Sequence, residues 1–324
     1  MIKKFVFSIL RINMASALIL TILFTLILVI IPHTSKAFLS GYNIDALGRS
    51  SSIVIMAALS QLLCLSIGQF NLAVGSMGCL AAMLSAHLME VYHTPIILAV
   101  IAGILISTIS GAIQGLLITK TGINPWIVTL SLTSVYLGII LGLEKGYYYQ
   151  NLPVAFKNFG GSSVFHVPVI FILAIVIGLI FAVIMDRTTI GRQLLATGAN
   201  VKAAAFSGIN TSRVVITAHT LSGFLAGIGG IFMVARMGFA ISSIGSDWMI
   251  PSVTAAVLGG TLLAGGSVSV IGTFFGAILM EIIRTGLFLF NINFLWFGLY
   301  IGIVLLIAFE FDRVRTSLIS IREK

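Results

Sequence analysis

The chain has 324 residues, of which 59% are hydrophobic and 8% are charged, and its mean hydropathy is +1.16. Ordinary soluble domains carry about 25% charged residues, and a soluble protein of this size could not bury so much apolar surface in one core. The composition therefore excludes a soluble globular protein and indicates the lipid bilayer as solvent. In that setting the net charge of +9 bears on membrane orientation, and we expect no nucleic-acid partner.

Ten apolar stretches of roughly membrane-spanning length follow one another along the chain. A transmembrane helix needs about 20 mostly apolar residues. With approximate boundaries, the stretches are 14–31, 50–69, 72–89, 95–118, 125–143, 167–185, 214–234, 250–264, 270–290 and 295–309. They predict an all-α, polytopic membrane protein with about ten transmembrane helices in a single domain over residues 1–324. The divisions at 69–72 and 264–270 are the least marked, because no long polar loop separates the neighbouring spans there.

The N-terminus has the outline of a signal peptide. Lys3 and Lys4 precede the apolar run 15–31, and Ser35-Lys36-Ala37 follows it. Because the run is longer than an ordinary signal-peptide core and further spans follow, we expect the segment to be retained as the first span.

The basic residues are spread unevenly over the loops. Cytoplasmic loops are typically rich in Lys and Arg, and with the N-terminus inside, twelve of the 18 basic residues fall on the inner side. These are Lys3, Lys4, Arg11, Lys120, Arg187, Arg192, Lys202, Arg213, Arg313, Arg315, Arg322 and Lys324. Lys36, Arg49, Lys145, Lys157 and Arg236 fall outside, and Arg284 lies within a span. The asymmetry predicts an even number of spans with both termini in the cytoplasm.

The ten spans divide around the sixth. Spans two to five begin on the outer side and spans seven to ten begin on the inner side, so the two groups have opposite directions. This arrangement is compatible with an inverted repeat, which is common in transporters. The inference rests on topology alone, because the two groups share no strong residue-level repeat.

Two polar residues, Gln69 and Asn71, interrupt the second and third spans, with Gly68 and Gly75 on either side. A helix broken inside the membrane frees backbone groups, and such breaks line cavities in transporters. The same residues also fit a short inner turn in which Asn71 caps the third span. Both interpretations stay open, and under the first Gln69, Asn71 and Gly75 are candidates for the solute pathway.

Two glycine pairs, Gly259-Gly260 and Gly265-Gly266, flank a short apolar stretch. They fit a re-entrant break beside a pathway, a tight turn between spans, or close helix packing. All four are candidates for the pathway under the first interpretation.

Glu281 and Arg284 place opposite charges three residues apart in the ninth span. Charges at this depth are costly and usually paired, and the spacing allows pairing along one helix face. We expect a local ion pair that holds the ninth span against a neighbour.

The longest inner loop, 186–213, carries a short predicted helix. Asn200 is placed to cap the run 201–207, which is rich in strong helix formers and ends at Gly208. Ala203, Ala204 and Ala205 keep this helix slim, so it suits docking in a groove of another protein. A lipid-surface helix is the alternative, but the run lacks the large apolar face and dense positive charge typical of one.

No G-x-x-x-x-G-K-[ST] sequence occurs, so this chain does not bind ATP in the P-loop manner. It also has no metal-spaced Cys/His set and no catalytic motif. We therefore expect a non-enzymatic chain without a metal or cofactor of its own. Few acidic residues lie in the spans, which argues against a proton-coupled carrier.

Several segments together resemble the ribose-type permeases of ATP-binding-cassette importers, over about residues 45–310. They are Asn71-Leu72-Ala73-Val74-Gly75-Ser76, Gly191-Arg192 through Ala199-Asn200, Ala203-Ala204, Ser207-Gly208-Ile209-Asn210, Leu221-Ser222-Gly223-Phe224-Leu225-Ala226-Gly227, Ala235-Arg236, Ala255-Ala256-Val257-Leu258-Gly259-Gly260-Thr261 and Gly265-Gly266. The inner loop resembles the family's cytoplasmic coupling segment. The resemblance implies that the ATPase is contacted by Gly191, Arg192, Ala199, Asn200, Ala203, Ala204, Ser207, Gly208 and Ile209. Asn71 departs from the family, which often has Asp at this position.

The resemblance also implies the partners and the location. A second permease subunit, identical or related, would complete the pathway in the bacterial cytoplasmic membrane. Cytoplasmic ATPase subunits, which carry the ATP and Mg, would grip the inner loops, and an external solute-binding protein would deliver a sugar or sugar-like solute. An ion-coupled secondary carrier is the alternative function.

Overall fold

The computed structural model of the chain describes residues 21–22, 25–26, 36–293, 296, 298–300, 302–303 and 306. The first expected span, 14–31, and the tenth, 295–309, lie largely outside these residues. The signal-like N-terminus and the basic residues of both terminal segments also lie outside them.

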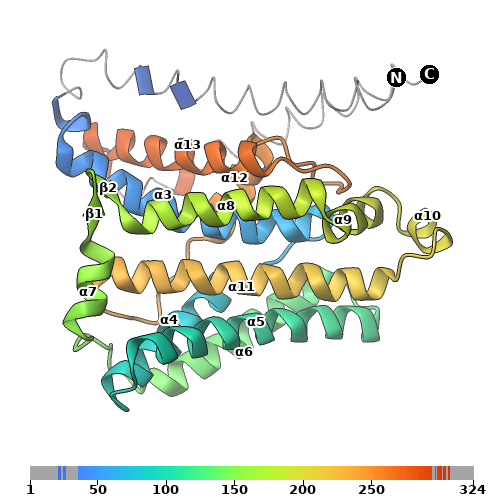
Figure 1. Cartoon of the computed structure of the whole chain (residues 1–324), viewed down its shortest axis with the longest axis horizontal. Coiled ribbons are helices and arrows are strands. Elements are labelled where there is room, and N and C mark those ends of the chain that lie inside the picture. Colours follow the sequence, from blue (N-terminus) through green and yellow to red (C-terminus); the bar gives the residue numbers. More distant parts are fainter. Residues whose placement is uncertain are drawn as a thin grey trace.

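The described part of the chain is mostly helical, with one small β-hairpin and several irregular connections (Figure 1). The helices are α3 (Gly41–Ser66), α4 (Val74–Glu90), α5 (Ile96–Thr121), α6 (Pro125–Glu144), α7 (Val154–Gly161), α8 (Val169–Arg187), α9 (Thr189–Ala199), α10 (Val201–Phe206), α11 (Thr211–Met237), α12 (Met249–Leu258) and α13 (Val270–Leu289). Strands β1 (Ser163–Val164) and β2 (Val167–Pro168) pair antiparallel.

Six helices among the described residues are long and apolar enough to cross a membrane: α3, α5, α6, α8, α11 and α13. They coincide with the second, fourth, fifth, sixth, seventh and ninth expected spans. The third expected span is α4, which has 17 residues. The expectation of a helical protein that crosses the membrane several times is thereby confirmed.

The eighth expected span, 250–264, is helical only over α12. This helix has 10 residues, and at about 1.5 Å per residue it covers roughly half of a bilayer core. Gly260, in the left-handed region with φ of +90°, ends it, and the amide of Thr261 donates to the carbonyl of Ala256 at 3.0 Å. This is the glycine cap that commonly terminates helices, so hydropathy alone overestimated the length of the span.

The helices differ in how much of their surface the protein itself covers. The most apolar windows of α3 and α11 are 78% and 72% buried, whereas those of α5, α6 and α8 are each 28% buried. Helix α11 packs against α3, α4 and α5, and in Figure 1 it lies between α4, α5 and α6 on one side and α3, α8 and α13 on the other. The exposed apolar faces of α5, α6 and α8 are those expected to meet lipid.

Two ends of the molecule are distinct. Helices α9 and α10 lie at one end of the bundle, whereas α7 and the β1–β2 hairpin lie at the other (Figure 1). At the second end the amide of Tyr149 donates to the carbonyl of Ala240 at 3.0 Å, and the amide of Asn151 donates to Glu90 at 2.9 Å. These contacts bring together segments that the sequence assigns to the outer side.

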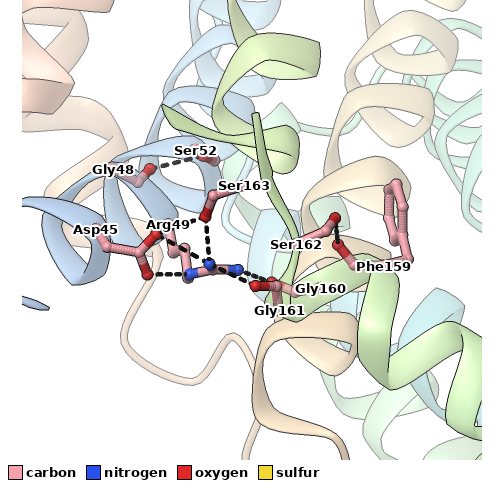
Figure 2. A network of polar contacts seen from close by, with 9 residues as sticks. All are labelled: Asp45, Gly48, Arg49, Ser52, Phe159, Gly160, Gly161, Ser162 and Ser163. Carbon is pink, nitrogen blue, oxygen red and sulfur yellow. Dashed lines mark hydrogen bonds and ion pairs between the residues drawn. The ribbon is translucent and has the colours of Figure 1, made fainter. Parts of the chain in front are cut away.

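Arg49 of α3 fastens α7 and the hairpin to the bundle (Figure 2). Its guanidinium pairs with Asp45 one turn earlier, with 2.9 Å between Nη2 and Oδ1. It also donates to the carbonyl of Gly160, to that of Gly161 at 2.8 Å, and to the hydroxyl of Ser163 at 3.0 Å. A planar guanidinium has five donors in fixed directions, so one side chain satisfies the carbonyls at the end of α7.

Candidate functional site

The helical structure is interrupted between α3 and α4, among buried helices. We call this interruption the first chain break, although the polypeptide itself is continuous. Gly68 ends α3 in the left-handed region with φ of +70°, and the amide of Gln69 donates to the carbonyl of Cys64 at 3.0 Å. Asn71 does not cap α4, because its Oδ1 accepts from the amide of Ala73 at 3.0 Å within the break, and Ala73 itself occupies the cap position. The side chain of Asn71 is fully buried.

A buried polar network joins this break to α5 and α11. Asn71 Nδ2 donates to Ser222 Oγ at 3.0 Å, and Gln69 Oε1 lies 3.0 Å from His219 Nε2. The other ring nitrogen of His219 lies 3.3 Å from Gln114 Oε1. His219, Ser222 and Gln114 are polar residues within apolar helical runs, but nothing local in the sequence indicates that they are partners of this break.

The second break, 259–269, lies against the first. The amide of Gly266 donates to the carbonyl of Ser66 at 3.0 Å, and Gly265 packs so closely on Gly68 that neither leaves room for a side chain. Gly259 packs instead on the first turn of α13, at Gly272 and Thr273. Of the expected pathway residues, Gly265 and Gly266 therefore belong to a junction of chain breaks.

The loop 186–213 reaches this same junction. A Cβ on Gly198 of α9 would collide with the carbonyl of Ser66, and one on Gly266 would collide with Ala199. We name the contact of residues 66–68, 264–266 and 198–199 the glycine junction. It links the segment expected to contact an ATPase directly to both chain breaks.

The short helix expected after Asn200 is present as α10. Asn200 Oδ1 accepts from the amide of Ala203 at 3.0 Å, and Gly208 follows the helix with φ of +82°. Phe206 is 92% exposed, whereas Ala204 is 4% exposed, so the bulkiest side chain of α10 points into solvent. The preceding helix α9, over Gly191 and Arg192, was not expected from the sequence; Thr188 caps it through the amide of Gly191.

A third irregular segment, 238–248, connects α11 to α12. It begins at Gly238, near Tyr149, and passes inward until Gly245 packs on Gly75 and Trp248 packs on Gly78. Non-helical backbone at such depth is tolerated in membranes only where protein covers it or where it lines a cavity.

This segment lines a cavity of about 610 Å³, within the range of about 300–1,000 Å³ typical of small-molecule sites. The expected pathway residue Gly75 is on its wall. Its polar lining comes from Ser76, Thr133, Ser242, Ser246, Asp247 and Arg284. A second cavity of about 680 Å³, beside the start of α3 and the end of α13, is also lined by Asp247 and Arg284, and by Glu281.

The expected ion pair of the ninth span is present and has a further member. Arg284 Nη1 lies 3.4 Å from Glu281 Oε1, and Arg284 Nη2 lies 3.0 Å from Asp247 Oδ2. The pair thus ties α13 to segment 238–248, which confirms contact with a neighbouring element. Asp247 follows Gly245-Ser246 and was not singled out in the sequence, because nothing local indicates that the chain turns inward there.

Metal-binding clusters are absent from the part of the chain that the structure describes, where no three His, Cys, Asp or Glu residues gather. The hydroxyl, carboxylate and guanidinium groups that line the two cavities can form hydrogen bonds and ion pairs.

Comparison with known proteins matches this architecture to transport systems. The D-allose transport system permease protein of Escherichia coli K12 is 28% identical over 277 residues, covering 86% of this chain and 85% of that protein. The ribose import permease protein of Bacillus subtilis 168 is 31% identical over 294 residues, covering 90% and 91%. The autoinducer 2 import system permease protein of Escherichia coli O157:H7 is 29% identical over 303 residues, covering 93% and 88%. No solved structure matches the chain significantly.

The sequence model of the family described as branched-chain amino acid transport system / permease component matches residues 43–309. This range includes every helix from α4 to α13 and nearly all of α3. The chain therefore belongs to this permease family, and its resemblance to the ribose-type permeases of ATP-binding-cassette importers is confirmed.

Proposed function

We propose that this permease carries a sugar or sugar-like solute across the bacterial cytoplasmic membrane, driven by ATP hydrolysis on partner subunits. The single observation that carries the proposal is the glycine junction, which connects the exposed α9–α10 segment to both chain breaks without an intervening side chain. Such a contact transmits movement, because a backbone segment in van der Waals contact with another cannot move toward it without displacing it.

The solute class is supported by the relatives and by the cavity. Relatives with 28–31% identity are named for the import of D-allose, ribose and autoinducer 2. The wall of the cavity of about 610 Å³ combines hydroxyl and charged groups with apolar side chains. Sugars present the same two kinds of surface, hydroxyl edges and C–H faces.

The proposed topology has ten spans, both termini in the cytoplasm and α10 on the cytoplasmic side. The contacts between Arg49, Gly160 and Gly161, and between Tyr149 and Ala240, support a common outer end for their loops. Among described residues, however, basic side chains are equally frequent at both ends. The asymmetry rests on the seven basic residues of the terminal segments, while at the outer end Arg49 is neutralised by Asp45.

The proposed coupling uses the protruding end of the inner loop. Phe206, 92% exposed beside small alanines, would enter a groove on the ATPase, and Asn200 and Gly208 would fix the ends of α10. ATP binding to the ATPase then favours one position of α9–α10 over another. A ligand shifts a conformational equilibrium only through such differential contact, and the glycine junction passes the shift to segments 67–73 and 259–269.

Reconstitution with the cognate ATPase and solute-binding protein tests this function. We expect the ATPase to copurify with the permease, and uptake of D-ribose or D-allose to require ATP and to persist when ion gradients are collapsed. Uptake that follows an ion gradient and ignores ATP would instead support the ion-coupled carrier.

Labelling with a membrane-impermeant thiol reagent tests the orientation. Lys202→Cys on α10 should be unreactive in intact cells, whereas the matched exposed residue on α7, Ala155→Cys, should react. The native Cys64 and Cys79 are buried and give a low background. Reaction at position 202 from outside would overturn the proposed topology and the import mechanism with it.

A further inference from the structure

We propose that Asp247 and Arg284, with the hydroxyls of Ser242 and Thr133, form a solute-binding site that selects uncharged polyhydroxylated molecules. The inference deepens the proposed function and rests on it, because it assigns the permease's own contacts to the solute. Nothing in the family description or the names of the relatives identifies such residues.

The first argument is position. Asp247 and Arg284 both line the cavity of about 610 Å³ and also the one of about 680 Å³. A solute that passes between these two spaces therefore meets both side chains. Asp247 belongs to the inward-running segment 238–248 and Arg284 to α13, so the site joins two different elements through one ion pair of 3.0 Å.

The second argument is accessibility. The side chains of Asp247 and Arg284 are 58% and 34% exposed, whereas Glu281, which also pairs with Arg284, is only 4% exposed. Glu281 thus provides the buried structural contact to Arg284. Asp247 faces open space, where its carboxylate, which has about four lone-pair sites, has capacity to accept further hydrogen bonds.

The third argument is charge. Arg236, Asp247, Glu281 and Arg284 line one small cavity of about 50 Å³ behind the pair, and their formal charges cancel. A neutral polyol adds no charge to this balance, and its hydroxyls both donate to a carboxylate and accept from a guanidinium. A phosphorylated sugar would bring a further negative charge close to the Asp247 carboxylate, and like charges at short range repel each other.

Protection of an introduced cysteine tests the site on the permease alone, without ATPase or binding protein. Ser246→Cys, which is exposed at the cavity wall, is labelled with a thiol reagent in nanodiscs. D-ribose, D-allose, ribose 5-phosphate and L-leucine are added in turn as probes. Ala155→Cys on α7, exposed and away from both cavities, is the matched control.

We expect at least one of the two neutral sugars to slow labelling at position 246 and neither to affect position 155. Ribose 5-phosphate and L-leucine should protect poorly. Adding Asp247→Ala should raise the sugar concentration for half-protection about tenfold, the effect of losing one hydrogen bond to a charged group. A Glu90→Ala variant, which removes a carboxylate outside the cavities, should leave protection unchanged.

The inference is overturned if neither neutral sugar protects position 246, if ribose 5-phosphate protects as well as ribose, or if Asp247→Ala leaves protection intact. These outcomes differ from failure of the proposed function. That failure would appear as absent ATPase capture or as uptake that ignores ATP, and neither quantity enters the labelling experiment.

Discussion

His219 Nε2 on α11 lies 3.0 Å from Gln69 Oε1 in the first chain break, and its Nδ1 lies 3.3 Å from Gln114 Oε1 on α5. A neutral imidazole donates through only one nitrogen. Gln114 Nε2 has no hydrogen-bond partner among the described residues. If the Oε1 and Nε2 positions of Gln114 are exchanged, Nε2 donates to His219 Nδ1, and His219 Nε2 donates to Gln69 Oε1. A neutral imidazole then has a hydrogen-bond partner at both ring nitrogens.

This network predicts a large effect of His219→Phe. The substitution removes the imidazole partner of Gln69, which is half-buried, and of Gln114, which is fully buried. An unsatisfied buried polar group costs about 1–3 kcal/mol. We expect a lower thermal unfolding temperature for the purified permease. His219→Phe combined with Gln69→Leu should be less destabilising than the sum of the two single changes, because the unpaired amide is removed as well. An unchanged unfolding temperature for His219→Phe would show that the network contributes nothing.

The glycine junction predicts that Gly198→Ala separates ATPase docking from transport. The added Cβ collides with the carbonyl of Ser66, so α9 must move away from the chain breaks while α10 stays exposed. We expect ATPase copurification to be retained and ATP-dependent uptake to fall at least about tenfold. Gly138→Ala on α6 is the matched control, since its Cβ meets no atom within 4 Å. Full uptake by Gly198→Ala would contradict a coupling role for the junction.

The cap of α10 predicts a milder effect of Asn200→Ala. Losing the hydrogen bond that Asn200 Oδ1 accepts from the amide of Ala203 costs about 1 kcal/mol of helix stability. Hydrogen exchange over 201–206 should therefore become roughly fivefold faster, and ATPase affinity should fall by a similar factor. Asn158→Ala, on the exposed face of α7, serves as control and should change neither quantity.

The Arg49 contacts predict a local effect of Arg49→Lys at the opposite end. A lysine keeps the charge but cannot reach Asp45, Ser163 and the carbonyls of Gly160 and Gly161 together, because it has one ammonium group instead of a planar fork. We expect faster hydrogen exchange over 154–168 with little change in α11. Exchange rates that match the wild-type protein would indicate that packing alone holds α7 and the hairpin.

The caps and the short ion-pair spacing were predictable because they depend on neighbouring residues. Asn200, Gly208 and the Glu281–Arg284 pair form contacts within one or two helical turns, so the local sequence specifies them. Six span positions were predictable for a similar reason, since a run of about 20 apolar residues satisfies its own backbone only as a helix in lipid.

Composition and local pattern are enough to assign the bilayer as the solvent of this protein and to predict six membrane-spanning helices and the capped helix of loop 186–213. The contacts of Gly198 with Ser66 and Gly266, of Gln69 with His219, and of Asp247 with Arg284 become visible only in the folded chain. Separation along the chain accounts for this difference. Periodicity and capping act over a few residues, whereas these contacts join segments from about 40 to 150 residues apart, and hydropathy does not distinguish one buried partner from another.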